Sequence, residues 1–185
     1  MVYRKNEYQH QKIAKGQMKK KQLWISFVVF ILFCLIVQIV GSFWTKETVS
    51  TWYPTLTKPS WMPPDWIFGP VWSALYIMIA VSGWLIYHAE YSYKRTVALM
   101  FYGGQLALNF IWSFLFFSLR SPTLGLIDIV LLCLLISLTI FKAWPVRPLA
   151  SLLLIPYLIW AIYAASLNAG IWLLNDASRL GLVGS

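Results

Sequence analysis

Charged residues are scarce in this chain of 185 residues, and acidic residues are scarcer than basic ones. Only 11% of the residues are charged and 59% are hydrophobic, so a soluble domain of this composition would expose an extensive apolar surface. The two cysteines, Cys34 and Cys133, lie inside apolar runs, and we expect no disulfide. The two histidines, His10 and His88, stand far apart. We therefore expect no metal site and no hydrolytic triad.

In place of charged residues, the chain contains long apolar runs. Five segments approach the length of about 20 residues that crosses a hydrocarbon core of about 30 Å. They cover residues 23–43, 67–87, 97–118, 124–141 and 149–174. Short connections with proline favour antiparallel neighbours. We predict an all-α integral membrane protein, a single bundle of five transmembrane helices over residues 23–175.

The net charge of +9 is concentrated at one end of the chain. Residues 1–22 form a polar tail with seven Lys or Arg against Glu7 alone. A basic tail beside a membrane span marks the cytoplasmic side and attracts anionic lipid. Eleven basic residues then lie inside and four outside, so the amino terminus is predicted to be cytoplasmic and the short tail 176–185 external. Binding to nucleic acid is not expected, because the tail has no folded reader.

The connection between the first two predicted spans, residues 44–66, is unusually long. It contributes most of the run WYPTLTKPSWMPPDWIFGPVWSALY, which extends from Trp52 to Tyr76. Long connections are usually functional or disordered, and this aromatic content argues against disorder. Its prolines fix the backbone and remove donors, while its tryptophans provide large rigid faces. We predict a lid over an aromatic-lined site.

The third predicted span carries polar and aromatic residues at helical spacing. Gln105, Asn109, Trp112 and Phe116 are four, three and four residues apart and form one stripe. Amide and indole groups in hydrocarbon need partners, which neighbouring helices or a ligand can supply, and both interpretations stay open. The same helix contains the small residues Gly103 and Ala107, which predict either a dimer contact or close packing within the bundle.

The second and fifth predicted spans repeat this pattern. Trp72 and Tyr76 lie one turn apart, and Pro156, Trp160 and Ala164 follow one line along the fifth span. Such stripes are often ordinary packing or interfacial belts. Both tryptophans lie several residues inside their spans, however, and a mid-span proline can kink a helix around a cavity. We predict that three helices each send a tryptophan inward.

Asp128 is the one acidic residue within a predicted span. An intramembrane carboxylate is a candidate functional group, although a carboxylate this near the start of a helix also suits the helix amino terminus. The chain has neither paired intramembrane carboxylates nor an inverted repeat. A proton-coupled secondary transporter is therefore disfavoured.

Three runs of the chain resemble the translocator protein family, the tryptophan-rich sensory (TspO/MBR) proteins or peripheral benzodiazepine receptor homologues. They are the lid run, GGQLALNFIWSFLFF and IPYLIWAIYAASLN, and the resemblance covers residues from about 40 to 175. It implies a five-helix bundle, commonly dimeric, with a pocket beneath the first loop for porphyrins such as protoporphyrin IX and haem and for synthetic drugs. The family's pocket residues correspond to Trp52, Trp61, Trp72, Asn109, Trp112, Trp160, Ala164 and Leu167.

The leading hypothesis is a porphyrin- or haem-binding sensor or carrier in membrane lipid, a homodimer of the bacterial cell envelope that requires no cofactor. A planar tetrapyrrole would lie against these indoles with Tyr76 beside them, and Lys58 or backbone amides would meet its propionates. The first alternative is an enzyme that degrades porphyrin with light and oxygen. The resemblance then implies catalytic roles for Trp112 and Trp160.

The second alternative is a sterol or lipid transporter. Animal members of the family bind cholesterol through Leu or Val, Tyr, and Lys or Arg at short spacing in the fifth helix. This chain departs from that pattern, because no basic residue follows Tyr163 before Arg179.

Overall fold

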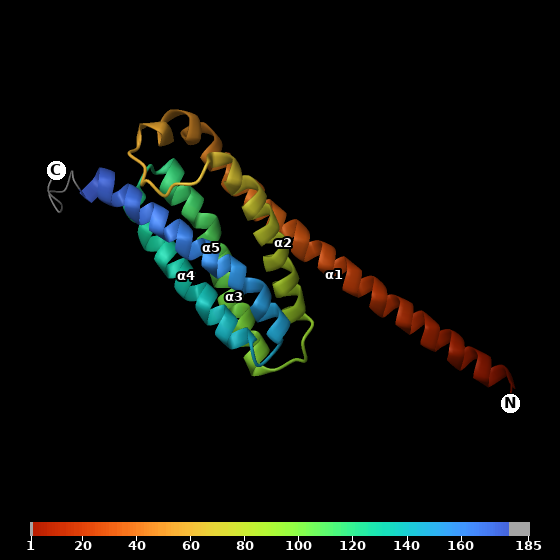
Figure 1. Cartoon of the computed structure of the whole chain (residues 1–185). Coiled ribbons are helices and arrows are strands. Elements are labelled where there is room, and N and C mark those ends of the chain that lie inside the picture. The colour runs from red at the N-terminus through yellow and green to blue at the C-terminus, as the bar shows by residue number, and fades with distance from the viewer. Residues whose placement is uncertain (1, 178–185) are drawn as a thin grey trace.

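The computed structural model describes the backbone of residues 2–177 and the side chains of residues 20–46 and 48–175. This part of the chain contains helices and no strand (Figure 1). The five α-helices are α1 (Val2–Thr51), α2 (Phe68–Tyr87), α3 (Tyr93–Ser113), α4 (Pro122–Ala143) and α5 (Pro148–Trp172). Each is long and apolar enough to cross a membrane. The predicted all-α fold of a multi-pass membrane protein is confirmed.

The helices contact one another in a closed ring. Around the ring, α1 contacts α2, α2 contacts α5, α5 contacts α4, α4 contacts α3, and α3 returns to α1. The amino-terminal half of α1 projects away from the ring (Figure 1). The contacts of α4 with α3 and with α5 join consecutive helices, as the short connections predicted. The ring gives the bundle an interior that every helix lines.

Side-chain caps fix where the helices begin. The Ser92 hydroxyl oxygen accepts a hydrogen bond from the Arg95 N–H at 3.2 Å at the start of α3, and Ser121 accepts one from Leu124 at 3.2 Å at the start of α4. Proline occupies the first position of both α4 and α5, where its missing N–H costs nothing. The predicted turns before the fourth and fifth helices are thus confirmed.

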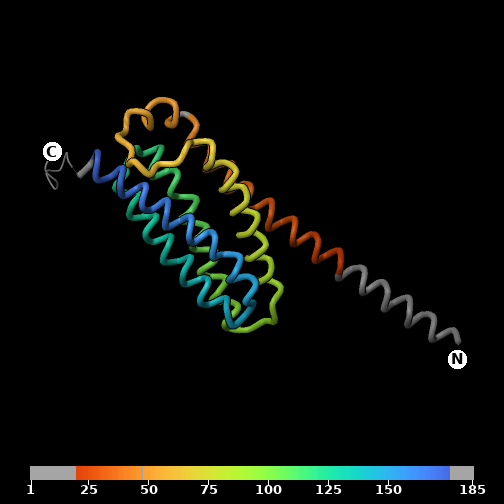
Figure 2. Tube along the Cα trace, in the orientation of Figure 1, coloured from red at the N-terminus to blue at the C-terminus, as the bar shows by residue number. Residues whose placement is uncertain are grey.

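The boundary between the first span and the lid differs from the prediction. We expected the span to end at residue 43 and the lid to cover 44–66, but α1 continues to Thr51. Residues 44–51 contain neither proline nor glycine, so nothing stops the helix until the chain nears Pro54. The lid is therefore residues 52–67, with short helices η1 (Tyr53–Thr55) and η2 (Asp65–Ile67). It closes one end of the bundle (Figure 2).

The two ends of the chain also differ from simple tails. The backbone of the predicted polar tail, 1–22, belongs to α1 from Val2 onward, because its many Lys and Gln residues favour a helix. At the other end α5 passes into the π-helix η4 (Leu173–Ala177). Residues 178–185 of the predicted carboxyl-terminal tail lie outside the described residues.

Helix α3 ends in a wide turn. The π-helix η3 covers Phe114–Ser118, and the N–H of Leu119 donates to the carbonyl oxygen of Phe114 at 3.0 Å. Phe116 and Phe117 are both buried there. A π-turn widens the helix locally and often occurs at functional sites. It allows two consecutive aromatic rings to point into the protein at the lid end.

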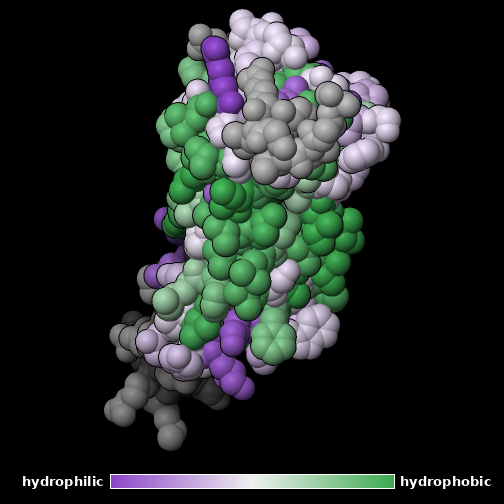
Figure 3. Space-filling view, turned by 90° about the vertical axis from the view of Figure 1, so that its left-hand side faces the viewer, coloured by the Kyte–Doolittle hydropathy of each residue, from purple (hydrophilic) through white to green (hydrophobic). Residues whose placement is uncertain are grey.

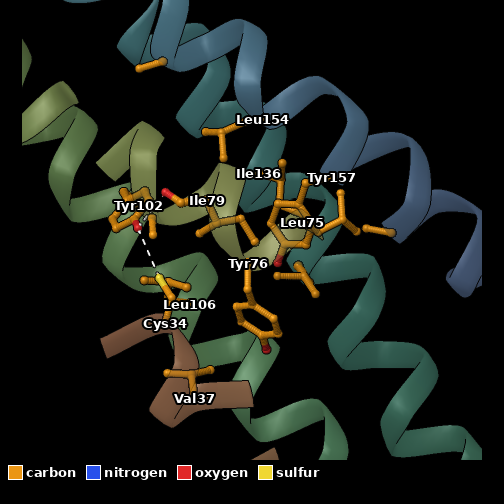
Figure 4. Close-up of a cluster of buried hydrophobic side chains, with 14 of the residues drawn as sticks. Cys34, Val37, Leu75, Tyr76, Ile79, Tyr102, Leu106, Ile136, Leu154 and Tyr157 are labelled. Carbon is orange, nitrogen blue, oxygen red and sulfur yellow. Dashed lines mark hydrogen bonds between the residues drawn. The ribbon is translucent and has the colours of Figure 1, made fainter. Parts of the chain in front are cut away.

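The core joins all five helices (Figure 4). Its buried residues include Cys34 and Val37 of α1, Leu75, Tyr76 and Ile79 of α2, Tyr102 and Leu106 of α3, Ile136 of α4, and Leu154 and Tyr157 of α5. The Tyr102 hydroxyl donates to the Ile79 carbonyl oxygen at 3.0 Å and lies 3.9 Å from the Cys34 sulfur. A tyrosine inside hydrocarbon thus has a protein partner.

The outer surface carries a hydrophobic band with polar residues toward its two ends (Figure 3). Large apolar side chains of α1 are also exposed, including Trp24, Val29, Ile36 and Phe43. A soluble protein would not expose so much apolar surface, whereas lipid tails solvate it. The band is the surface expected to face the bilayer.

His88 at the carboxyl-terminal end of α2 has a perturbed pKa. Its Nε2 lies 2.7 Å from the Ser26 hydroxyl oxygen, which also accepts the Trp84 indole N–H at 3.2 Å. Partial burial, and secondarily the positive charge of Arg95, lower the pKa of His88 below its ordinary value of 6.5. The folded protein therefore favours the neutral imidazole.

The free energy of unfolding should decrease as the pH falls below about 6.5, because the unfolded chain then binds a proton that folded His88 resists. Thermal unfolding in detergent at pH 7.5 and 5.5 measures this dependence. His88→Asn keeps a hydrogen-bonding side chain and should reduce the difference between the two pH values. An undiminished difference in that variant would contradict the assignment to His88.

Candidate functional site

Asn109 of α3 lies inside the bundle and connects three helices. The Tyr76 hydroxyl of α2 donates to Asn109 Oδ1, and Asn109 Nδ2 donates to the Tyr157 hydroxyl oxygen of α5 at 2.9 Å. All three side chains are buried. Interhelical hydrogen bonds of this kind contribute about 0.6 to 2 kcal/mol each in membrane proteins. This group, the Asn109 tie, fixes the positions of α2, α3 and α5 relative to one another.

An aromatic platform begins about one helical turn beyond Asn109 along α3, toward the lid. It consists of Trp112, Phe116 and Trp52. The rings of Trp112 and Phe116 stack with centroids 5.1 Å apart and an interplanar angle of 17°, and Trp52 meets Phe116 edge-on at 5.7 Å. Offset and edge-on pairs are the arrangements that aromatic quadrupoles favour. Residues from α3 and the lid thus build one surface.

Asn168 of α5 holds the platform in place. The Trp112 indole N–H donates to Asn168 Oδ1 at 3.3 Å, and Asn168 Nδ2 donates to the Pro122 carbonyl oxygen at 2.8 Å. Gly125 makes this junction possible, since a Cβ there would lie 2.8 Å from Phe116 Cδ2 and 2.9 Å from Asn168 Oδ1. The platform therefore depends on a close approach of α3, α4 and α5.

Trp160 of α5 carries a donor that is not satisfied. Its ring lies 5.8 Å from Phe68 and 5.5 Å from Tyr163, measured between centroids. Its indole N–H is buried and has no hydrogen-bond partner in the described part of the chain. Leaving a buried donor unpaired costs about 1 to 3 kcal/mol, so such a group is a candidate for contact with a ligand.

The lid is fastened to α5 and to the following η4 by side chains. Asn175 Oδ1 accepts from the Thr57 N–H and Asn175 Nδ2 donates to the Thr57 carbonyl oxygen, both at 3.0 Å. The Tyr163 hydroxyl donates to the Trp61 carbonyl oxygen at 2.9 Å. We call the Asn175–Thr57 pair the lid latch. In this latch the side-chain amide of Asn175 makes two hydrogen bonds with the backbone N–H and carbonyl of Thr57.

The inner side of the lid is formed around Tyr53. Lys58 Nζ lies 4.0 Å from the centroid of the Tyr53 ring, a cation–π distance, and the Tyr53 hydroxyl contacts the Met62 sulfur at 3.7 Å. Burial, and then the charge of Asp65, raise the pKa of Tyr53 to about 12. Tyr53 therefore keeps its proton at neutral pH.

The predicted ligand-binding residues fall into three groups. Trp52 and Trp112 belong to the platform, while Tyr76 and Asn109 belong to the tie, against which Trp72 packs with centroids 5.8 Å from Tyr76 and 6.2 Å from Tyr157. The third group comprises Trp160, Ala164 and Leu167 of α5, and the ring of Trp61, which is 52% exposed at the lid.

One expectation about the stripes is wrong in detail. Pro156 is exposed, while Trp160 and Ala164 of the same predicted line are partly buried and pack against the core. A proline exposed to lipid needs no cavity beside it, because membrane helices tolerate the missing bond. Gln105 is fully buried, as the stripe of α3 predicted, and neither of its amide atoms has a hydrogen-bond partner among the described residues.

Three residues that complete the site do not stand out in the sequence. Tyr157, Asn168 and Asn175 share one face of the α5 end of the chain, at intervals of eleven and seven residues that return to the same side of a helix. The two buried residues, Tyr157 and Asn168, could have been predicted from this spacing. The latch could not, because its hydrogen bonds join residues 118 positions apart.

The small residues of α3 lie on its outer face. Gly103 and Ala107 are exposed, and a Cβ at Gly103 would meet nothing within 4 Å. Close packing within the bundle is thus the wrong alternative for this pair. The dimer contact stays a prediction.

Replacing Asn175 by Ala should loosen the lid, because it removes both latch hydrogen bonds. We expect the backbone amides of residues 57–62 to exchange with deuterium roughly tenfold faster, as the loss of one to two bonds implies. Ser166→Ala is a matched control, since its hydroxyl bonds only within α5, to the Tyr163 carbonyl oxygen at 2.7 Å. Equal exchange in the wild type and Asn175→Ala would show that the latch does not hold the lid.

The sequence of this chain is similar to a known protein family and to several of its members. Residues 30–173 match the model of the TspO/MBR family. The chain is 41% identical over 151 residues to the tryptophan-rich protein TspO of Archaeoglobus fulgidus, which covers 82% of this chain and 97% of that protein. It is 36% identical over 160 residues to the human translocator protein, covering 85% and 95% respectively.

A bacterial relative is similar over a comparable length. The tryptophan-rich sensory protein of Cereibacter sphaeroides is 31% identical over 145 residues, which are 78% of this chain and 88% of that protein. The region that the family model matches, residues 30–173, contains α2 to α5, the lid and every residue of the tie and the platform. The family resemblance of the sequence is confirmed, and the chain belongs to the TspO/MBR family.

Proposed function

We propose that this protein binds a planar tetrapyrrole, such as protoporphyrin IX or haem, beneath the lid and acts as a membrane sensor or carrier. The observation that carries the proposal is the buried indole N–H of Trp160, which has no partner in the described chain although it lies among aromatic rings at the lid. A nitrogen or carboxylate acceptor of a ligand would satisfy it. Relatives named as translocator and sensory proteins are consistent with this role.

The platform suits a flat, largely apolar ligand. Trp112, Phe116 and Trp52 offer ring faces and edges, which gain free energy from stacking against a conjugated macrocycle. Lys58 lies on the lid, where its ammonium group could leave Tyr53 to meet a propionate. Pockets for small molecules typically combine apolar walls with a few such polar groups.

Binding beneath the lid requires movement. The platform rings contact one another, and the lid is latched to η4 at the end of α5. A ligand must therefore separate the lid from the platform before it can stack there. Lid opening is expected to limit the association rate, as it does in other proteins with closing loops.

The membrane setting completes the proposal. The basic residues favour an orientation with the amino terminus in the cytoplasm and the lid on the outer side of a bacterial envelope membrane. The exposed pair Gly103 and Ala107 would allow two copies of α3 to approach closely in a homodimer.

Titration of the detergent-purified protein with protoporphyrin IX in the dark tests the site. Trp160→Phe keeps an aromatic ring but removes the N–H, and should weaken binding about fivefold, the value of one hydrogen bond. Trp112→Ala removes half of the stacked pair and should weaken it at least tenfold. Trp24→Phe is the control, because Trp24 is 69% exposed on α1. Unchanged affinity in both site variants would refute the assignment.

The same samples under light and oxygen separate binding from degradation. A sensor or carrier should leave the porphyrin absorbance no less stable than that of free porphyrin. Bleaching that the protein accelerates, and that Trp112→Phe and Trp160→Phe abolish, would replace the proposed role with that of an enzyme. Displacement of the porphyrin by a sterol would favour the transporter alternative.

A further inference from the structure

Two adjoining clefts lie at the end of the bundle opposite the lid. The first, of about 350 Å³, is formed by the α2–α3 and α4–α5 connections and is lined by residues that include Glu90, Tyr91, Lys94 and Arg147. The second, of about 320 Å³, runs between the start of α3 and the end of α4. Lys94 and Pro145 line both clefts, so the two form one continuous depression.

The two clefts differ in chemistry. The first is bordered by charged and hydroxyl groups. The second is bordered mainly by apolar surface, including Val97, Phe141 and Trp144, with Lys142 at its edge. A polar cleft joined to an apolar groove matches a molecule with a polar head and a hydrocarbon tail. Neither cleft includes a residue of the tie, the platform or the lid.

The lining of the clefts is positively charged. Lys94, Lys142 and Arg147 face a single lining carboxylate, that of Glu90. No ion pair joins Lys94 or Arg147 to another residue of the described chain, and Lys142 Nζ lies 5.5 Å from the Phe141 ring centroid. These cations are available to an anion. Basic pockets between transmembrane helices bind the head groups of anionic lipids.

We propose that this depression binds an anionic phospholipid. Its phosphate lies between Lys94 and Arg147, and one acyl chain follows the groove along Val97 and Phe141. The position fits the membrane boundary, because α3 begins and α4 ends beside the clefts and Trp144 is half exposed there. A free phosphate would use the polar cleft alone and leave the apolar groove without a role.

Native mass spectrometry of the detergent-solubilised full chain, with phosphatidylglycerol or phosphatidylcholine added, measures this binding. The double variant K94Q/R147Q should bind phosphatidylglycerol roughly 25-fold more weakly, since each Lys or Arg at an anionic surface accounts for about a fivefold change and two are removed. Binding of phosphatidylcholine should not change. The charge-matched control K46Q/R120Q removes one Lys and one Arg from the lid end and should retain phosphatidylglycerol.

Two further variants keep the test decisive. V97W fills the groove and should weaken phosphatidylglycerol binding. Inorganic phosphate should compete only weakly with the lipid, in the wild type and in every variant. K142Q alone should give a partial loss, and it substitutes for the double variant if K94Q/R147Q lowers the unfolding temperature in phosphatidylcholine.

Three results would overturn the proposal. Equal losses in K94Q/R147Q and K46Q/R120Q would show that general electrostatic attraction, and not a site, holds the lipid. Full retention of phosphatidylglycerol in K142Q and K94Q/R147Q would exclude these cations. If inorganic phosphate competes fully with phosphatidylglycerol and V97W binds the lipid normally, the depression is a phosphate site and not a lipid site.

Discussion

Burying a polar side chain inside the bilayer without a hydrogen-bond partner is costly, and in this protein Asn109 supplies partners across three helices at once. Its amide accepts from Tyr76 and donates to Tyr157, so none of the three groups is left unpaired in hydrocarbon. Displacing any one of these helices would leave polar groups without partners. The tie thus sets the register of the bundle, on which the positions of the aromatic residues above it depend.

Helix α5 transmits that register from the bundle centre to the lid. One face of it carries Tyr157 of the tie and Asn168, which holds Trp112, and the chain continues into the π-turn that contains Asn175 of the latch. The core, the platform and the lid are therefore attached to a single element. A shift of α5 would displace side chains in the core, the platform and the lid. This is a physical route by which ligand binding under the lid could alter the bundle.

Much of this arrangement could be predicted from the chain itself. Five apolar runs determine the fold class, and the spacing of Asn109, Trp112 and Phe116 correctly placed one buried face of α3. Predictions failed where a local pattern allowed neighbouring registers. Pro156 was expected on the inward-facing line of α5 but is exposed, and the end of α1 at Thr51 depended on the absence of a helix breaker. The partners of Asn168 and Asn175 are long-range contacts that only the fold supplies.

An experimental structure of the protein with bound protoporphyrin IX is the decisive measurement, because the proposed site is a single place beneath the lid. We predict that the macrocycle lies between the lid and the Trp112–Phe116 stack, with a ligand acceptor at the Trp160 indole N–H and the Asn109 tie unbroken. A macrocycle bound on the lipid-facing surface, with the platform rings still in contact beneath a latched lid, would contradict the account.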